Sequence, residues 1–368
     1  MIFHDSQPGT IEDHPAAIEA SMRASLSALD QACRDADTLI TLRGKLRFTK
    51  SGPQFIDGVV RRDFSIEART REWIQVRDPM SDLLGNAAVG QNCGVEAVWP
   101  RHYPVRFLSG NAALVNIEEV FVYFPYALEL EDKASDAVFG FEFVDVSESI
   151  IEAVHVPCMQ AAFAEQDWRK SVDLLLARRT EAIYLYSILH EISHGVGPWR
   201  VIPSCDENLR LSAAQLAIMG ELAADLDAAC RAANFPEVGL LIFMNRIFWY
   251  ARRGFADDNR RGKLNADNDA WGGAWLWERS VAHGLVSTKG ARLILDVARL
   301  PAFYESCRRE VTELGQTLLA AGTGQRGMLD AWMRKGVPGA QDQFIYPESL
   351  CRLFQKCSNV PEHIPRVI

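Results

Sequence analysis

The sequence lacks the features that send a chain into or across a membrane. Its longest apolar run, Val238 to Met244, is far too short to span a bilayer, and it is followed directly by Asn245 and Arg246. The first residues carry neither the basic stretch nor the apolar core of a secretory signal. The eight cysteines are scattered and form no Cys-x-x-Cys pair. We therefore expect a cytoplasmic protein with reduced thiols and no membrane partner.

Positive charge is also scarce in this chain. Its 368 residues include 39 Lys and Arg against 48 Asp and Glu, which gives a net charge of −9. The sequence contains no basic run of the kind that follows a phosphate backbone. An acidic balance disfavours binding to nucleic acid, so we expect no nucleic-acid partner. Nothing in the composition indicates an oligomeric state.

The pattern of apolar residues predicts an α+β fold with two lobes. The N-terminal α+β lobe is expected over residues 1–155, with a helix over 11–42 and strands within 112–117, 120–124 and 139–146. A predominantly helical lobe is expected over 156–368. Its predicted helices are 168–196, 211–233, 236–253, 269–284, 288–298, 301–321 and 324–335, with an irregular tail after 336.

One helical segment carries a pattern typical of a metal site. Residues 190–194 read His-Glu-Ile-Ser-His. Positions four apart lie about 40° apart around a helix axis, so His190 and His194 can chelate one ion. Glu191 projects to the flank, where it can reach a metal-bound water without binding the metal. The alternative is a pair of ordinary histidines on a helix.

A second helical segment offers the third ligand. Glu221 and Asp225 are four apart and therefore share a face. A carboxylate from a packed helix completes a site of two His and one Glu, and it leaves one position for water or substrate. Asp225 can then accept the Nδ1–H of a ligand histidine and fix its tautomer. The alternative is a solvated acidic face that also includes Asp227.

At these residues the sequence resembles the dipeptidyl peptidase III family of zinc peptidases, in its short His-Glu-x-x-His form. The first motif continues as Gly-x-Gly-Pro through Pro198. The family's second motif, Glu-Glu-x-x-Ala-Asp or a near variant, is matched by residues 220–225, Gly-Glu-Leu-Ala-Ala-Asp. The resemblance covers residues 183–275. It implies a zincin-like helical lobe with Zn²⁺ at His190, His194 and Glu221. It also implies that Glu191 is the general base.

The chain departs from the family pattern at three positions. Gly220 stands where the family usually has another Glu, and Ala223 replaces a basic residue that is common there. The best match to a later Ala-His-Gly motif is residues 270–272, with Trp271 in the place of the histidine that helps to stabilise the transition state. These departures bear directly on whether peptide hydrolysis is retained.

Three further residues are candidates for a substrate pocket near the predicted metal. Trp271 and Tyr250 belong to a series of aromatic residues that is more typical of a core than of a cleft. His283 could replace the missing transition-state histidine, although a histidine near a helix C-terminus is also favoured by the helix dipole.

The leading hypothesis is a zinc-dependent metallohydrolase that acts on a small peptide or amide-like substrate. Two alternatives stay open. One is a non-hydrolytic enzyme of secondary metabolism (an isomerase, lyase or oxidative enzyme) that uses Zn²⁺ or Fe²⁺, because two histidines and a carboxylate also hold iron with open positions. The other is a metal-stabilised binding protein without catalytic activity.

Overall fold

The computed structural model describes most of the C-terminal half of the chain and parts of the N-terminal half. The described residues are 39–46, 54–80, 83, 102–110, 122–123, 140–202, 211–258, 260–264, 268–321, 325–340 and 343–362. They form two compact units. The first contains the described residues up to Val76 and those from His102 to Ile150, and the second contains those from Arg77 to Leu83 and from Ile151 to Glu362. The fold is mainly helical with small sheets, which confirms the predicted α+β class. The predicted lobe boundary after residue 155 stays a prediction.

The first unit is built on a five-stranded sheet with the order β1-β2-β3-β5-β4. Its neighbouring strands are antiparallel except for β3 and β5, which are parallel. The strands are β1 (Leu39–Leu46), β2 (Gln54–Arg62), β3 (His102–Gly110), β4 (Val122–Tyr123) and β5 (Gly140–Phe143). Two helices belong to this unit, α3 (Phe64–Arg77) and α5 (Val144–Ile150). Buried Val60 of β2 and Ile66 of α3 contribute to its core.

The structure corrects part of the N-terminal prediction. Residues 39–42, expected at the end of a helix, lie in β1, where they pair with β2 and bury Ile40. Pairing with a neighbouring strand thus overrides the local helical pattern. The rest of that predicted helix, and the predicted strand 112–117, lie outside the described residues. Strands β4 and β5 fall within the predicted segments 120–124 and 139–146, but a helix replaces the strand from Val144 onward.

The second unit consists mainly of helices. It begins with the π-helix η3 (Ile151–His155), and its two longest helices are α11 (Ala213–Arg231) and α15 (Leu300–Ala321). The other helices are α6 (Val156–Ala162), α7 (Glu165–Ala177), α8 (Arg179–His194), α9 (Pro198–Val201), α12 (Pro236–Met244), the π-helix η5 (Asn245–Ala251), α13 (Arg252–Asp258), α14 (Asn268–Ala282), the 3₁₀ helix η6 (Val297–Arg299), α16 (Gln325–Gly336) and α17 (Glu348–Lys356). Two small antiparallel sheets join β7 (Val286–Lys289) to β8 (Arg292–Leu295), and β6 (Arg261–Lys263) to β10 (Gln343–Ile345) and β9 (Gly339–Ala340).

Most predicted helices of this unit are present, and three segments differ. The segment 168–196 is two helices, because the backbone of Arg178 leaves the helical region. The segment 236–253 passes through α12, η5 and α13. The predicted helix over 288–298 is wrong: β7 and β8 form a hairpin there, and Gly290, with φ of 61°, supplies the left-handed conformation that its two-residue loop needs. The predicted irregular tail contains β9, β10 and α17.

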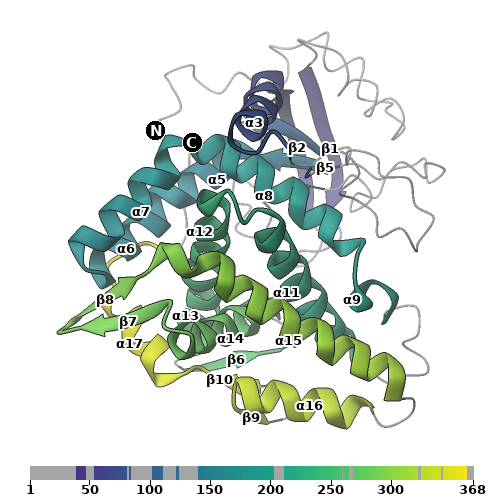
Figure 1. Ribbon diagram of the computed structural model, residues 1–368. Helices are drawn as coiled ribbons and strands as arrows, with labels where there is room; N and C mark the ends of the chain where they lie inside the picture. Colours follow the sequence, from purple (N-terminus) through teal and green to yellow (C-terminus); the bar gives the residue numbers. More distant parts are fainter. Residues whose placement is uncertain are drawn as a thin grey trace. The chain divides into compact units, whose positions relative to one another are not determined.

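Helices α8 and α11 lie side by side in the second unit (Figure 1). The capping box of Ser212 and Gln215 begins α11. Between the two helices, the Ser193 hydroxyl donates to Asp227 Oδ2 at 2.9 Å. The chain leaves α8 at Gly197, whose φ of 73° favours glycine, and Trp199 then donates its indole N–H to Val311 O of α15 at 3.0 Å. These contacts fix the end of α8 that carries residues 190–194.

Helix α14 approaches η5 more closely than a side chain would allow. A Cβ atom at Gly273 would lie 2.1 Å from the carbonyl oxygen of Arg246 and 2.8 Å from Ala251 Cβ. Contacts this short do not occur, so glycine is needed for the two helices to pack. At Gly220 of α11, in contrast, an added Cβ would meet no atom within 4 Å.

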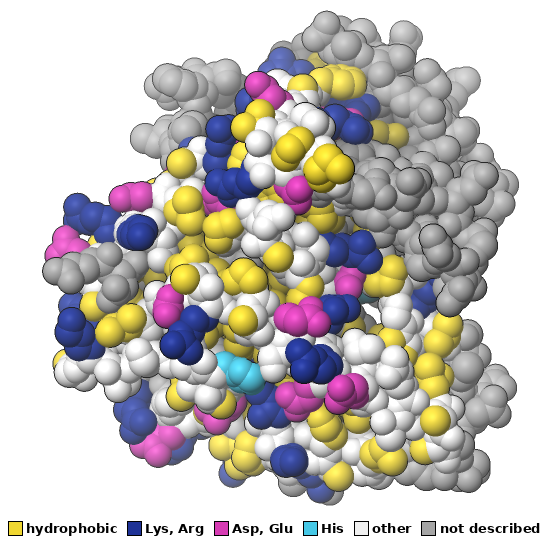
Figure 2. All heavy atoms as spheres, viewed as in Figure 1, with side chains coloured by type: hydrophobic (Ala, Val, Ile, Leu, Met, Phe, Trp, Pro, Cys, Tyr) yellow, Lys and Arg dark blue, Asp and Glu magenta, His cyan; other side chains and the backbone are white. Residues whose placement is uncertain are grey.

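The surface shows no segregation of charge on the side drawn in Figure 2. Basic and acidic side chains of the described residues are interspersed there with hydrophobic ones. Of the helices that the structure describes, none is long and apolar enough to cross a membrane.

The two glycines make a matched test of this packing. We expect Gly273→Ala to lower the free energy of unfolding by about 1–3 kcal/mol, since overpacking forces the backbone of η5 to move. We expect Gly220→Ala to raise it by about 0.5–1 kcal/mol, because alanine favours a helix interior and space is open there. Urea unfolding followed by circular dichroism measures both changes. Equal effects of the two substitutions would contradict the close approach of α14 to η5.

A buried histidine provides a second test of the core. His155 at the end of η3 is completely buried, and neither ring nitrogen has a hydrogen-bond partner in the described structure. Burial lowers the pKa of His155 to about 3, because the charged form loses its hydration. The His155 ring is therefore neutral in the folded protein, whereas in the unfolded chain it takes up a proton below its ordinary pKa of 6.5.

The sign of the resulting pH dependence follows from this difference. Between pH 6.5 and 3 the unfolded state binds more protons at this residue, so the stability contributed by His155 falls as the pH falls. From pH 7 to pH 5 we expect a loss of about 2 kcal/mol that His155→Phe removes. Denaturant unfolding of wild type and His155→Phe, both without metal, at pH 7 and pH 5 measures this loss. Identical pH dependence in wild type and variant would show that His155 is not buried as a neutral ring.

Candidate metal centre

The two helices α8 and α11 bring the three predicted ligands together. The Nε2 atoms of His190 and His194 lie 3.0 Å apart. Glu221 places one carboxylate oxygen 3.2 Å from His190 Nε2 and the other 3.6 Å from His194 Nε2. The histidines are one turn apart on α8, and the carboxylate comes from the facing turn of α11.

These separations fit one small divalent cation. Ligand atoms that are each about 2.0–2.1 Å from zinc and in tetrahedral arrangement lie about 3.3 Å from one another. The distances of 3.0, 3.2 and 3.6 Å, the last two to different oxygens of Glu221, bracket that value. Ligand atoms of His190, Glu191 and His194 also lie within 4.8 Å of one another, so Glu191 is a second carboxylate within reach of an ion there. The side chain of His190 is 13% exposed, whereas those of His194 and Glu221 are 36% and 37% exposed, so the centre is open to solvent on one side.

Asp225 makes the hydrogen bond expected of it. Its Oδ1 atom lies 2.7 Å from Nδ1 of His190. A carboxylate at this distance accepts the Nδ1–H, which leaves the lone pair of Nε2 facing Glu221 and His194. Asp225 is 1% exposed, so the alternative of a solvated acidic face does not apply to it. The neighbouring acid on this helix, Asp227, instead bonds Ser193 and Arg231.

Three residues that the sequence analysis did not single out complete the surroundings of Asp225. Tyr186, one turn before His190, donates its hydroxyl to Asp225 Oδ1 at 2.9 Å. Arg246 of η5 donates its Nε to Asp225 Oδ2, and its Nη1 to Asp269 of α14 at 2.6 Å. A usable signal for Arg246 was present in the sequence, since it lies between the apolar segments 238–244 and 247–251, and an arginine buried among such residues is almost always paired.

Electrostatics at the centre favour a dication. Burial alone would lower the pKa of His190, but hydrogen bonds and charges from Asp225 and Glu221 raise it well above its ordinary value. Partial burial would raise the pKa of Glu221, yet His190, His194 and Arg246 lower it to about 2. With both histidines neutral, the ionised carboxylates of Glu221 and Asp225 already outnumber the single guanidinium of Arg246, and Glu191 and Asp269 lie close by. A bound cation would reduce that excess of negative charge.

The three candidates for the substrate pocket lie in different surroundings. Trp271 is 1% exposed and packs against Trp332, with ring centroids 6.0 Å apart, so its ring belongs to the core of this unit. Tyr250 lies beside the guanidinium of Arg246, 5.3 Å from its carbon to the ring centroid. His283 is exposed just after α14 and contacts Phe303. A substrate pocket formed by these residues stays a prediction.

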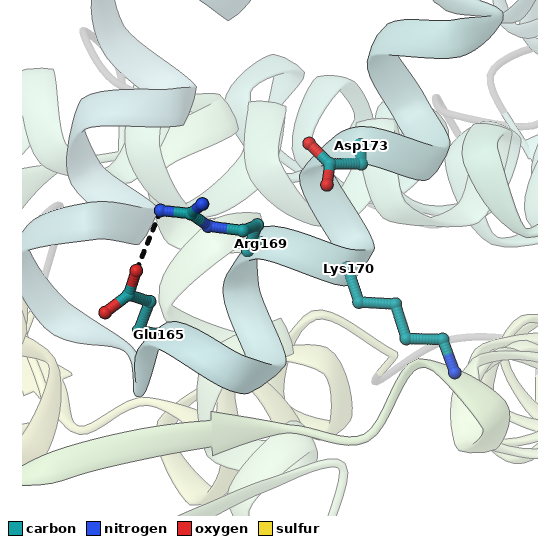
Figure 3. Close-up of a pocket in the computed structure, with 4 residues that line it drawn as sticks. All are labelled: Glu165, Arg169, Lys170 and Asp173. Carbon is teal, nitrogen blue, oxygen red and sulfur yellow. Dashed lines mark hydrogen bonds and ion pairs between the residues drawn. The ribbon is translucent and has the colours of Figure 1, made fainter.

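A surface hollow of about 480 Å³ lies elsewhere, along α7. Figure 3 shows Glu165, Arg169, Lys170 and Asp173 around it, with Glu165 and Arg169 paired at 2.7 Å. Both partners of that ion pair are more than half exposed, so solvent screens it and its contribution to stability is small. The hollow is open and charged, and it contains none of the predicted metal ligands.

Comparison with solved structures identifies the fold. The chain is similar to dipeptidyl-peptidase III from Corallococcus sp. strain EGB, with 14% identity and a TM-score of 0.56 over 92% of this chain and 60% of that one. It is also similar to DPP III from Caldithrix abyssi, with 12% identity and a TM-score of 0.58 over 92% of this chain and 62% of that one. The chain thus spans about three fifths of the length of these proteins. No protein-family model and no curated protein matches its sequence.

The contacts of Asp225 generate a graded prediction for metal affinity. We expect Asp225→Asn to weaken zinc binding by about 10- to 100-fold, because the amide is a poorer acceptor for the His190 Nδ1–H. Glu221→Ala should weaken it further, since it removes a donor atom. Asp173→Asn, at an exposed position of α7 outside the centre, is the control and should leave affinity within about 2-fold of wild type. Competition with a chromogenic chelator measures all four proteins.

Two outcomes would overturn these assignments. If Asp225→Asn binds zinc as tightly as the Asp173→Asn control, Asp225 does not orient the histidine. If Glu221→Ala also binds like the control, another group supplies the third donor atom.

Proposed function

We propose that the chain is a zinc-dependent metallohydrolase that cleaves a small peptide or amide-like substrate. The observation that carries this proposal is the close approach of His190 Nε2, His194 Nε2 and the two carboxylate oxygens of Glu221, at 3.0 Å between the nitrogens and 3.2 and 3.6 Å from each nitrogen to one of the oxygens. Similarity of fold to two dipeptidyl-peptidase III structures supports it. Because the chain spans only about three fifths of those proteins, the substrate is proposed as a chemical class and not taken from their names.

Each residue of the centre has a role in this proposal. When bound, zinc would act as a Lewis acid that polarises a carbonyl and lowers the pKa of water. With zinc bound, His190 and His194 would each present a neutral nitrogen, while Glu221 would supply negative charge. Glu191 follows His190 on α8, where its carboxylate can take a proton from an attacking water and pass it to the leaving nitrogen. Asp225 holds His190 in the tautomer that leaves Nε2 free to bind.

A second candidate function rests on the position of Trp271. If residues 270–272 correspond to the Ala-His-Gly motif, a buried indole stands where an imidazole would stabilise the transition state of peptide hydrolysis. A centre of two histidines and a carboxylate without that group suits a non-hydrolytic enzyme, with zinc or iron(II) as the metal. A metal-stabilised binding protein is the third outcome that the experiments below distinguish.

The proposed partner is a small molecule or short peptide, and neither nucleic acid nor a membrane is proposed. Support for a cytoplasmic location comes from the cysteines: those that the structure describes, Cys158, Cys230, Cys307, Cys351 and Cys357, are all free.

The role of Glu191 is tested by separating metal binding from turnover. We expect zinc-loaded wild type to cleave members of a short-peptide library, with new termini detected by mass spectrometry. Glu191→Gln should keep stoichiometric zinc and reduce the rate by about 100-fold or more, because an amide cannot accept the proton. His194→Ala is the control for metal loss, since two remaining donors hold zinc poorly.

Activity of Glu191→Gln comparable to wild type would place the base on another residue. Stoichiometric zinc without any cleavage would favour the non-hydrolytic enzyme, and so would iron in place of zinc. A tightly bound metal without an exchangeable water ligand would favour the metal-stabilised binding protein.

A further inference from the structure

Arg246 is a buried residue that bonds several groups around the proposed metal centre. Its guanidinium bonds Asp225 through Nε, Asp269 at 2.6 Å through Nη1 and the backbone oxygen of Glu221 at 3.2 Å through Nη2. One side chain of η5 therefore contacts the carboxylate that orients His190, the main chain of the proposed ligand Glu221, and α14. It touches none of the proposed donor atoms itself.

The cost of burying this charge indicates a specific role. Arg246 is only 2% exposed, and a buried guanidinium loses a large hydration energy that paired carboxylates have to offset. Asp225 and Asp269 supply that pairing, and the ring of Tyr250 covers the guanidinium. A planar fork with several donors can bond three acceptors at once, which an ammonium group cannot do in the same geometry.

The backbone around Arg246 is adapted to this position. Arg246 lies in the π-helical turn η5, and such turns occur frequently at functional sites because the extra residue redirects side chains. On the facing helix, a Cβ atom at Gly272 would lie 3.3 Å from Arg246 Nη1, and Gly273 permits the contact with the Arg246 carbonyl. The π-turn and the glycine pair together admit the guanidinium between α11 and α14.

We propose that Arg246 is a positioning residue of the metal centre: it locks the carboxylate of Asp225 and the backbone of Glu221 so that the three donor atoms stay at the spacing a dication needs. This inference rests on the proposed metal site. It differs from a purely structural role, because it predicts a change at the metal beyond a change in stability.

The chain offers a matched control in Arg252, six residues further along. Arg252 is 3% exposed and donates to the backbone carbonyls of Cys357, Val360 and Pro361, with the thiol of Cys158 as a further neighbour. Both arginines are thus buried and bond several acceptors, but only Arg246 reaches the centre. Replacing each by lysine removes the same fork and keeps the same charge.

The experiment compares zinc affinity, metal-free thermal stability and the visible spectrum of the cobalt-substituted protein. We expect Arg246→Lys to lower zinc affinity by about 10- to 100-fold and to change the cobalt absorption, because the ligand geometry relaxes. Arg252→Lys should lower the melting temperature while keeping zinc affinity within about 2-fold of wild type and the cobalt spectrum unchanged. Asp269→Asn, which releases one partner of Arg246, should lower affinity by about 3-fold or more, and it tests the same link if Arg246→Lys does not fold.

The outcomes separate this inference from the proposed function. Wild type that binds neither zinc nor cobalt overturns both. If wild type binds zinc and Arg246→Lys and Asp269→Asn bind it equally well, Arg246 has no positioning role, whatever the hydrolytic activity. An equal loss of affinity in Arg252→Lys would show that the effect follows from general destabilisation, and it would also overturn the inference.

Discussion

The carboxylate of Asp225, almost completely removed from solvent, is the constraint on which the arrangement of the second unit depends. It accepts hydrogen bonds from Tyr186 and His190 of α8 and from Arg246 of η5. Burial would raise the pKa of Asp225, but Arg246 and His190 hold it well below its ordinary value, so the group stays ionised. An ionised carboxylate in such a place is strongly destabilising unless every partner is kept, which ties the packing of three elements to one side chain.

Local periodicity explains why the sequence could predict that the candidate metal ligands lie together. His190 and His194 lie about one helical turn apart, as do Glu221 and Asp225, so helix geometry alone places each pair on one face, with Glu191 at the flank of the first pair. Pairing the two faces needed only the assumption that α8 and α11 pack together, which they do. Tyr186, Arg246 and Asp269 were missed because their partners come from other elements, and spacing carries no information about such contacts. The π-turn η5 likewise follows from packing and leaves no periodic signal of its own.

The fold errors have a similar cause. The segment 288–298 has apolar positions compatible with a helix, but the left-handed Gly290 and strand pairing impose a hairpin. Residues 39–42 have a helical pattern, yet they pair with β2. In each case contacts with distant residues decide between structures that local preference leaves nearly equal in energy.

Similarity of fold at 12% and 14% identity shows architecture alone, so the proposed function depends on the proposed metal site. The most direct measurement is X-ray absorption at the zinc edge of the zinc-loaded protein. A centre of His190, His194, Glu221 and water predicts about four nitrogen or oxygen neighbours at about 2.0–2.1 Å, with the outer-shell scattering of two imidazoles. Sulfur neighbours at about 2.3 Å, or no imidazole scattering, would contradict this ligand set and show that the metal binds another part of the chain.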